Sequence, residues 1–220
     1  MTSSKRLFRC ATAKERKSKL FAGSSSKQTA LEKFLNNHTE STNPIDATFS
    51  RSLPVQKGHM SRFVPTGYSS HASYFSEDKE VTFYEYLFHV ITHTHSKGSI
   101  FKLAIFIADI NFRDGKKKNI NRLQPKKKKL ILDPNTYEHS HEYINNLDSV
   151  PSSITYRSVR ASKDINNHAI YNINDIFNIS KDLTPILAKV IKSSGSHYNV
   201  ELDMNSHTQI IEIEKKHPHL

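Results

Sequence analysis

The stretch Ser-Ile-Phe-Lys-Leu-Ala-Ile-Phe-Ile-Ala-Asp-Ile, residues 99–110, decides the fold class of this chain. It is apolar, rich in β-branched and aromatic side chains, and about as long as a buried strand. Gly98 precedes it and the pair Asp114-Gly115 follows it, and both are typical of turns. We therefore expect a central strand here.

Patterns on both sides of this strand predict a mixture of strands and helices. Leu7 and Phe8 with the neighbouring Arg9 indicate a first strand. Residues 76–93 are predicted to form a helix, because Ser-Glu-Asp-Lys-Glu at 76–80 is a typical helix start and Leu87 and Phe88 then lie on one face. Further expected elements are helices at 29–35 and 185–192, strands at 130–132, 143–147 and 154–159, and a hairpin of 198–204 with 209–213.

The composition predicts one folded domain with a basic character. The 220 residues are enough to bury a core, and twelve Phe and nine Tyr compensate for a hydrophobic fraction of only 36%. The formal net charge of +11 makes phosphate-bearing molecules plausible partners. The single cysteine, Cys10, excludes an internal disulfide framework, so nothing in the cysteine count requires an oxidising compartment.

No segment has the pattern of a membrane span or an export signal. The longest apolar run, residues 100–110, contains Lys102 and Asp109 and is shorter than the roughly 18 residues needed to cross a bilayer. The basic N-terminus is followed by no hydrophobic stretch, which argues against Sec-type export. The sequence thus predicts no membrane span.

A block of basic residues follows the expected central strand. Lysines occupy positions 116–118 and 126–129, so that the block runs from Lys116 to Lys129. Two interpretations stay open: the block is a solvated loop, or it contacts a polyanion.

Four stretches resemble, in the same order, the bacterial mono-ADP-ribosyltransferase toxins related to pertussis and cholera toxins. They are the first strand with Arg9, residues 62–73, residues 97–115, and residues 138–154, where Glu142 is followed by an apolar stretch and a Val-Pro bend. The resemblance implies an α+β fold of the ADP-ribosyltransferase type, with two packed, mostly antiparallel sheets and flanking helices. It covers about residues 5–164, so that residues 1–164 are expected to form a catalytic core and residues 165–220 a C-terminal extension packed on the same domain.

The resemblance also implies that NAD is the co-substrate and that Arg9 lies under its phosphates. A guanidinium fork can bind a pyrophosphate through paired hydrogen bonds, which lysine cannot do with the same geometry. The serine motif that supports the nicotinamide pocket corresponds to Ser70, with Ser69 beside it. In another register Pro65 stands at the position of the serine, with Thr66 beside it. His38 corresponds to the family's histidine near the adenosine.

Glu142 corresponds to the catalytic glutamate of the family. Its carboxylate is expected to accept a hydrogen bond from the 2′-hydroxyl of the nicotinamide ribose and to stabilise an oxocarbenium-like transition state. Ser140 stands two residues earlier, where the arginine-modifying members have glutamate, and Glu138 is a substitute on the same turn. The chemistry of the acceptor is therefore open. Ala11 stands where the family has an aspartate after its arginine.

Two other groups of reactive side chains are given structural interpretations. His89, His93 and His95 have spacings that metal ligands use, but no cysteine or carboxylate completes a set, so no metal is expected. Cys10 lacks a histidine partner in the sequence pattern and is expected to be a buried strand cysteine rather than a nucleophile.

The sequence therefore predicts a glycosyltransferase that moves ADP-ribose from NAD to a host macromolecule, expected to be a protein, and releases nicotinamide. The richness in Asn, Ile and Lys indicates an AT-rich genome, and the expected location is that of a bacterial toxin or effector secreted or injected into a host cytosol. Two alternatives remain open. One is a non-enzymatic, basic nucleic-acid-binding protein, and the other is a catalytically degraded family member that acts as a binding protein.

Overall fold

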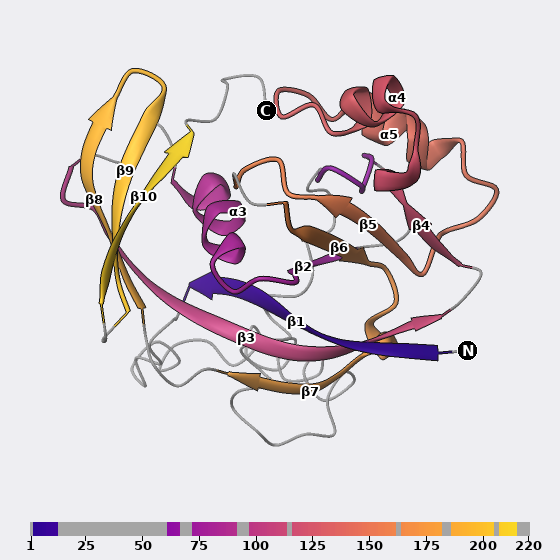
Figure 1. Cartoon of the computed structure of the whole chain (residues 1–220), viewed down its shortest axis with the longest axis horizontal. Helices are drawn as coiled ribbons and strands as arrows, with labels where there is room; N and C mark the ends of the chain where they lie inside the picture. Colours follow the sequence, from indigo (N-terminus) through magenta and orange to yellow (C-terminus); the bar gives the residue numbers. More distant parts are fainter. Residues whose placement is uncertain are drawn as a thin grey trace, which may run out of the picture.

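A mostly antiparallel sheet organises the part of the chain that the structure describes (Figure 1). The structure is a computed structural model, and it describes residues 2–12, 61–66, 72–91, 97–113, 116–161, 164–181, 186–204 and 207–214. Ten strands in these segments form one hydrogen-bonded sheet, and helices α3, α4 and α5 pack against it. The fold class is thus α+β, as the sequence predicts.

The expected central strand is confirmed as β3 (Ile100–Arg113). It pairs antiparallel with β1 (Thr2–Thr12) on one side, and with β7 (Ile176–Lys181) and β8 (Ile186–Ser194) on the other. Its apolar side chains explain this position, because the strand buries residues on both faces of the sheet. The buried residues of β3 are Leu103, Ala104, Ile105, Phe106, Ala108, Ile110 and Phe112.

The described strands hydrogen-bond in one series rather than in the two separate sheets that were expected. Their order is β10-β9-β8-β3-β1-β2-β6-β5-β4, with β7 beside β3. The series is weakest between β1 and β2 (Ser73–Ser76), where Phe8 opposite Ser76 is the single register pair. The strands diverge from this point, so that β8–β10 and β4–β6 lie on opposite sides of Figure 1.

The helix predicted at 76–93 is confirmed as α3 (Val81–Val90). The carboxylate of Asp78 caps its start, since Oδ1 accepts hydrogen bonds from the N–H groups of Glu80 (2.8 Å) and Val81 (3.0 Å). Leu87 and Phe88 are buried against β8, β9 and β10. Helix α3 therefore covers one half of the sheet.

Three predictions of local structure were wrong. The lysine-rich stretch is not a loop followed by a strand at 130–132, because Pro125 begins α4 (Pro125–Ile131) and lysine is a good helix former. Residues 143–147 lie mostly in α5 (Glu138–Asn145), whose buried Ser140 and Ile144 are one helical turn apart. The helix predicted at 185–192 is strand β8, where buried Ile186 and Ala188 alternate with exposed residues.

The remaining elements follow the sequence patterns closely. The expected strand at 154–159 is β5 (Ser153–Arg157), and the expected hairpin is β9 (His197–Asp203) with β10 (Thr208–Glu214). Short elements complete the series: β4 (Lys117–Asn119), β6 (Asn166–Ile170), and the 3-10 turns η1 (Ile120–Arg122) and η2 (Ile173–Asp175). The helix predicted at 29–35 lies outside the described residues.

The segment after residue 164 contributes directly to the sheet. Strand β6 lies between β2 and β5 and pairs antiparallel with both. Strands β7 and β8 flank β3. The chain on either side of the predicted domain division thus shares one sheet.

A polar network ties β1, β2, β5 and β6 together around His168. Its Nε2 lies 2.9 Å from Glu77 Oε1, and its Nδ1 lies 3.0 Å from Thr155 Oγ1. Lys5 Nζ is 2.5 Å from the same Glu77 oxygen. Burial lowers the pKa of His168, although Glu77 opposes this shift, so the imidazole is neutral at pH 7.

We predict that this network makes the protein less stable as the pH falls below 6.5. The unfolded chain, with a histidine pKa of 6.5, takes up the proton before the folded protein does, so the free energy of unfolding declines from that pH downward. Burial alone would raise the pKa of Glu77, but hydrogen bonds from Lys5 and His168 lower it, so its own contribution is lost only in more acidic solution. Urea unfolding of wild type and His168→Gln between about pH 7.5 and pH 5 measures the effect. The variant should lose less stability over this range, and equal losses would contradict the assignment.

Candidate functional site

A cavity of about 310 Å³ opens where β1, β2 and α3 meet the start of α5. Its volume lies at the lower end of the range that ligand sites occupy. Among the described residues, its lining combines guanidinium groups, phenol rings and one carboxylate: Arg9, Arg62, Arg160, Tyr74, Tyr86, Tyr137, Tyr156 and Glu85. This mixture is suited to a ligand that carries both negative charge and flat rings.

Arg9 comes from β1 and lies in the cavity wall. Strand pairing with β3 at Phe106 fixes its backbone, and Nη1 donates a hydrogen bond of 3.1 Å to the carbonyl oxygen of Tyr74 on β2. Burial lowers the pKa of Arg9 to about 10, so the guanidinium still carries its charge at pH 7. The cavity therefore has a fixed cation beside β2.

Tyr74 forms the wall next to Arg9. Its hydroxyl is 2.7 Å from Ser61 Oγ and accepts a hydrogen bond of 3.1 Å from the N–H of Phe63. Burial raises the pKa of Tyr74 to about 12, so the phenol stays neutral. These bonds hold the ring in place at the cavity wall.

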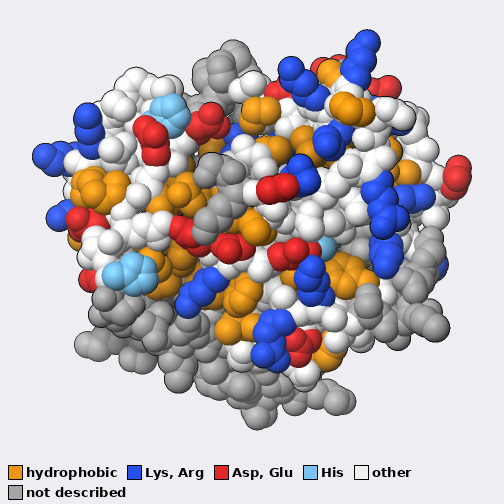
Figure 2. Space-filling model, in the orientation of Figure 1, with side chains coloured by type: hydrophobic (Ala, Val, Ile, Leu, Met, Phe, Trp, Pro, Cys, Tyr) orange, Lys and Arg blue, Asp and Glu red, His pale blue; other side chains and the backbone are white. Residues whose placement is uncertain are grey.

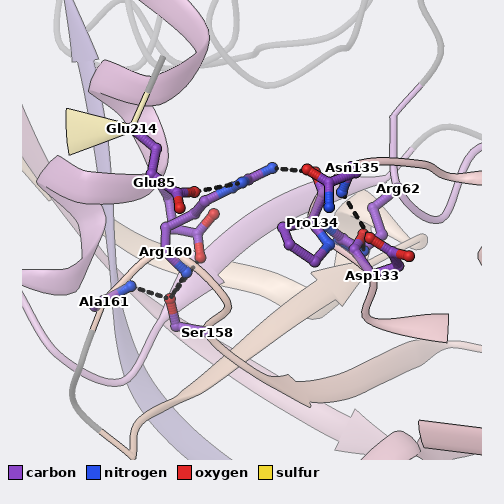
Figure 3. Close-up of polar contacts among 9 residues, drawn as sticks. All are labelled: Arg62, Glu85, Asp133, Pro134, Asn135, Ser158, Arg160, Ala161 and Glu214. Atoms are coloured by element: carbon purple, nitrogen blue, oxygen red, sulfur yellow. Dashed lines mark hydrogen bonds and ion pairs between the residues drawn. The ribbon is translucent and has the colours of Figure 1, made fainter. Parts of the chain in front are cut away.

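Arg62 reaches the cavity from the short segment before β2. Its Nη1 donates to the carbonyl oxygens of Ile131 (3.3 Å) and Asp133 (2.9 Å), which lie at the C-terminal end of α4. Helix carbonyls at this end have no partner within the helix, so a cation is favoured there. The guanidinium carbon also lies 5.0 Å from the ring centre of Tyr137. Figure 3 shows Arg62 beside Asp133.

Arg160 closes the cavity from the loop after β5. Its guanidinium carbon lies 3.5 Å from the ring centre of Phe88. Nη2 donates to the carbonyl oxygen of Pro134 (3.0 Å), and Nη1 lies 3.4 Å from Glu214 Oε2 (Figure 3). Its side chain is only 6% exposed. Burial lowers the pKa of Arg160, while the negative charge of Glu85 opposes this shift. The residue joins α3, the α4–α5 loop and β10.

Glu85 is the carboxylate of the cavity lining, and two neutral groups hold it. Its Oε1 accepts hydrogen bonds of 2.7 Å from Ser158 Oγ and of 2.7 Å from Asn167 Nδ2. Burial raises the pKa of the nearby Tyr156 well above its usual value, and the charge of Glu85 adds to this. A carboxylate fixed in this way can accept a hydrogen bond from a ligand hydroxyl or stabilise a positive charge.

The structure separates the site residues that the sequence predicts. Arg9 lines the cavity, whereas Thr66 is exposed in the segment before β2. Glu142 lies on α5 outside the described lining, with 67% of its side chain exposed and Oε2 3.5 Å from His139 Nδ1. Ser140 is buried and its hydroxyl donates to the carbonyl oxygen of Tyr137 at 2.7 Å. The roles that the resemblance implies for Arg9, Thr66, Ser140 and Glu142 stay predictions. His38, Ser69 and Ser70 lie outside the described residues.

Sequence reasoning missed most of the cavity. Arg62 stood inside a stretch that the resemblance covers, but no pattern marked it as a site residue. Glu85 lies in the middle of an amphipathic helix, where a carboxylate is usually solvated. Its partners are Ser158, in the loop after β5, and Asn167, on β6, so only the tertiary structure reveals the cluster.

The cysteine and histidine predictions have separate outcomes. Cys10 is buried, as expected, and burial raises the pKa of its thiol, so it stays protonated at pH 7. His89 lines the cavity, while His93 and His95 lie outside the described residues. Within the segments that the structure describes, no three side chains of His, Cys, Asp or Glu are grouped to hold a metal ion.

No helix in the described part of the chain has the length and apolar character to cross a membrane. The sequence matches no protein-family model, and comparison with curated proteins gives no significant match.

We predict that Arg160→Gln lowers the free energy of unfolding by about 2 kcal/mol, because the variant loses the stacking on Phe88 and a buried charged hydrogen bond. Arg157→Gln is the matched control, since Arg157 is exposed and its pair with Asp164 lies at the surface. This control should change stability by less than about 0.5 kcal/mol. Urea unfolding at pH 7 measures both, and equal losses would show that Arg160 does not organise the cavity.

Proposed function

We propose that the protein is an NAD-dependent mono-ADP-ribosyltransferase and that NAD binds in the cavity beside Arg9. The observation that carries the proposal is the position of Arg9. The resemblance assigns this residue to the phosphates of NAD, and its guanidinium lies in the wall of a cavity lined by further arginines and tyrosines. A basic cavity with flat aromatic walls is complementary to a pyrophosphate that joins two ring systems.

Electrostatics support an anionic ligand. Three arginines, Arg9, Arg62 and Arg160, line the cavity together with one described carboxylate, Glu85. Arg160 is also paired with Glu214, which lies outside the lining. Burying like charges together is unfavourable unless an opposite charge joins them, so an anion in the cavity would stabilise the folded protein. The aromatic rings of Tyr137 and Tyr156 offer faces for a nicotinamide or adenine ring.

The transfer step needs a carboxylate near the nicotinamide ribose. The bond between ribose C1′ and the nicotinamide nitrogen breaks, and its electron pair neutralises the pyridinium. The acceptor's lone pair then forms a new bond to C1′, and the acceptor's proton passes to solvent. Glu85 lines the cavity. In this proposal its carboxylate stabilises the positive charge that develops on the ribose, as in glycoside cleavage. Glu142 would need to act from outside the described lining.

We predict that Glu85→Gln keeps NAD binding and lowers ADP-ribosyl transfer about a hundredfold or more, because the amide keeps the shape but loses the charge that the transition state requires. Glu142→Gln is measured beside it, and we expect the smaller loss there. The assay follows nicotinamide release and the transfer of labelled ADP-ribose to proteins of a host-cell lysate. A loss confined to Glu142→Gln would restore Glu142 as the catalytic carboxylate.

We predict that Arg9→Lys weakens NAD binding about tenfold or more, because an ammonium group cannot form the paired hydrogen bonds of a guanidinium. Arg6→Lys is the matched control on the same strand, since Arg6 is exposed and pairs with Asp109 on β3. This control should bind NAD as wild type does. Isothermal titration with NAD measures both variants, and equal affinities for Arg9→Lys and wild type would remove NAD from this cavity.

The proposal includes a protein acceptor in a host cytosol, as expected for a secreted or injected effector. The position of Glu142 favours one alternative, a catalytically degraded family member that binds NAD without cleaving it. Titration that detects NAD binding together with an absence of nicotinamide release in wild type would establish this alternative.

A further inference from the structure

A second basic surface lies outside the cavity, on α4 and β4. Between residues 116 and 132 the chain has eight Lys or Arg and no Asp or Glu. Figure 2 shows Lys and Arg side chains gathered at the upper right, over α4, and at the right, over β4. We call this region the lysine surface and define it by five exposed lysines: Lys116, Lys118, Lys126, Lys127 and Lys129.

The lysine surface is the outer side of a firmly packed unit. Ile120, Ile131 and Ile144 are buried in one core with Phe63 and Ile154. Strand β4 pairs parallel with β5, and α4 packs on α5. The lysines are therefore held on packed secondary structure. They do not form the solvated loop that was one interpretation of the sequence.

Two large apolar side chains are exposed in this region, Leu130 within the lysine-rich helix α4 and Val150 in a turn beside β4. Leu130 is 42% exposed on α4, and Val150 is 38% exposed in the turn after α5. The N–H of Ser152 donates to the carbonyl of Lys116, which brings the turn with Val150 next to the first lysines. Exposed apolar residues that are ringed by cations are typical of proteins that lie on a membrane, where the apolar groups enter the headgroup layer.

The chemistry of the surface favours lipid over nucleic acid. Single-stranded nucleic acid is bound by exposed aromatic rings that stack on bases. In the described segment 116–157, no Phe or Tyr is exposed, and the ring of Tyr143 lies under Lys127 with 5.7 Å between its centre and Nζ. The apolar side chains of Leu130 and Val150 gain no favourable contact with a phosphate backbone, whereas they can insert into the interfacial layer of a bilayer.

We propose that the lysine surface docks the protein on an anionic lipid membrane. Lysine ammonium groups contact the headgroups, and Leu130 and Val150 enter the interfacial layer. This inference does not depend on the proposed NAD chemistry. The cavity lies elsewhere in the fold, and none of the five lysines lines it.

Sedimentation of the full chain with vesicles tests the proposal. The vesicles contain equimolar phosphatidylcholine and phosphatidylserine, and vesicles of pure phosphatidylcholine are the reference. The variant Lys126→Gln/Lys127→Gln/Lys129→Gln should reduce the partition coefficient at least about tenfold, since each lysine near an anionic surface contributes about fivefold. The matched control, Lys97→Gln/Lys189→Gln/Lys192→Gln, removes the same charge from exposed positions elsewhere and should change binding less than about twofold.

Leu130→Gln separates the lipid proposal from simple charge attraction. It leaves the net charge unchanged, and the exposed position should tolerate a helix-forming glutamine. We expect it to reduce vesicle binding about fivefold and to leave binding of a short DNA duplex unchanged.

Four results overturn the proposal. Equal losses in the two triple variants would mean that net charge alone attracts the vesicles. Vesicle binding by Leu130→Gln as tight as that of wild type would mean that charge attraction alone holds the protein, without insertion of apolar side chains. Tighter binding of the duplex than of the vesicles at equal salt would assign the surface to nucleic acid. Failure of wild type to bind the anionic vesicles at low salt would exclude lipid docking. Thermal unfolding of each variant identifies any loss that comes from misfolding.

Discussion

The pairing of β1 with β3 is the constraint on which the rest of the structure depends. All eleven residues of β1 are in register with β3, from Thr2 opposite Arg113 to Thr12 opposite Leu103. Cys10 of β1 packs into the core under α3, whereas Leu7 and Ala11 pack into a second core. The same strand carries Arg9 to the cavity. Two cores and one arginine of the cavity wall thus rely on one ladder of backbone hydrogen bonds.

The cavity exists because the sheet opens beside this ladder. Strand β2 meets β1 at one register pair and then continues along β6. Helix α3 and the loop that carries Arg160 close the space from outside. Side chains from these elements contact one another across the cavity: Ser158 and Asn167 donate hydrogen bonds to Glu85, and the guanidinium of Arg160 stacks on the ring of Phe88. The charged groups are therefore held in fixed orientations, which would lower the cost of binding the proposed ligand.

The positive charge of the protein is divided between two kinds of site. Arginines line the cavity, where burial is tolerated because the guanidinium is weakly hydrated and forms planar, directed hydrogen bonds. Lysines cover α4 and β4, where the strongly hydrated ammonium groups stay in water. A net charge of +11 alone does not distinguish a directed binding site from a docking surface. The proposed NAD site is lined by arginines, whereas the proposed docking surface carries lysines.

The sequence by itself determined the central strand, helix α3, the final hairpin and the α+β class. These elements have complete periodic patterns, such as the unbroken apolar run of β3 and the capped, one-sided face of α3. It did not determine α4, α5 or β8, which are short and have patterns that suit either a strand or a helix. Of the residues that line the cavity, it singled out Arg9 but not Glu85, Arg62 or Arg160. These residues are brought together by strand pairing and by hydrogen bonds that span as many as 82 positions, from Glu85 to Asn167. Local sequence patterns do not predict contacts between residues so far apart in the chain, so only the tertiary structure decided which charged groups share the cavity.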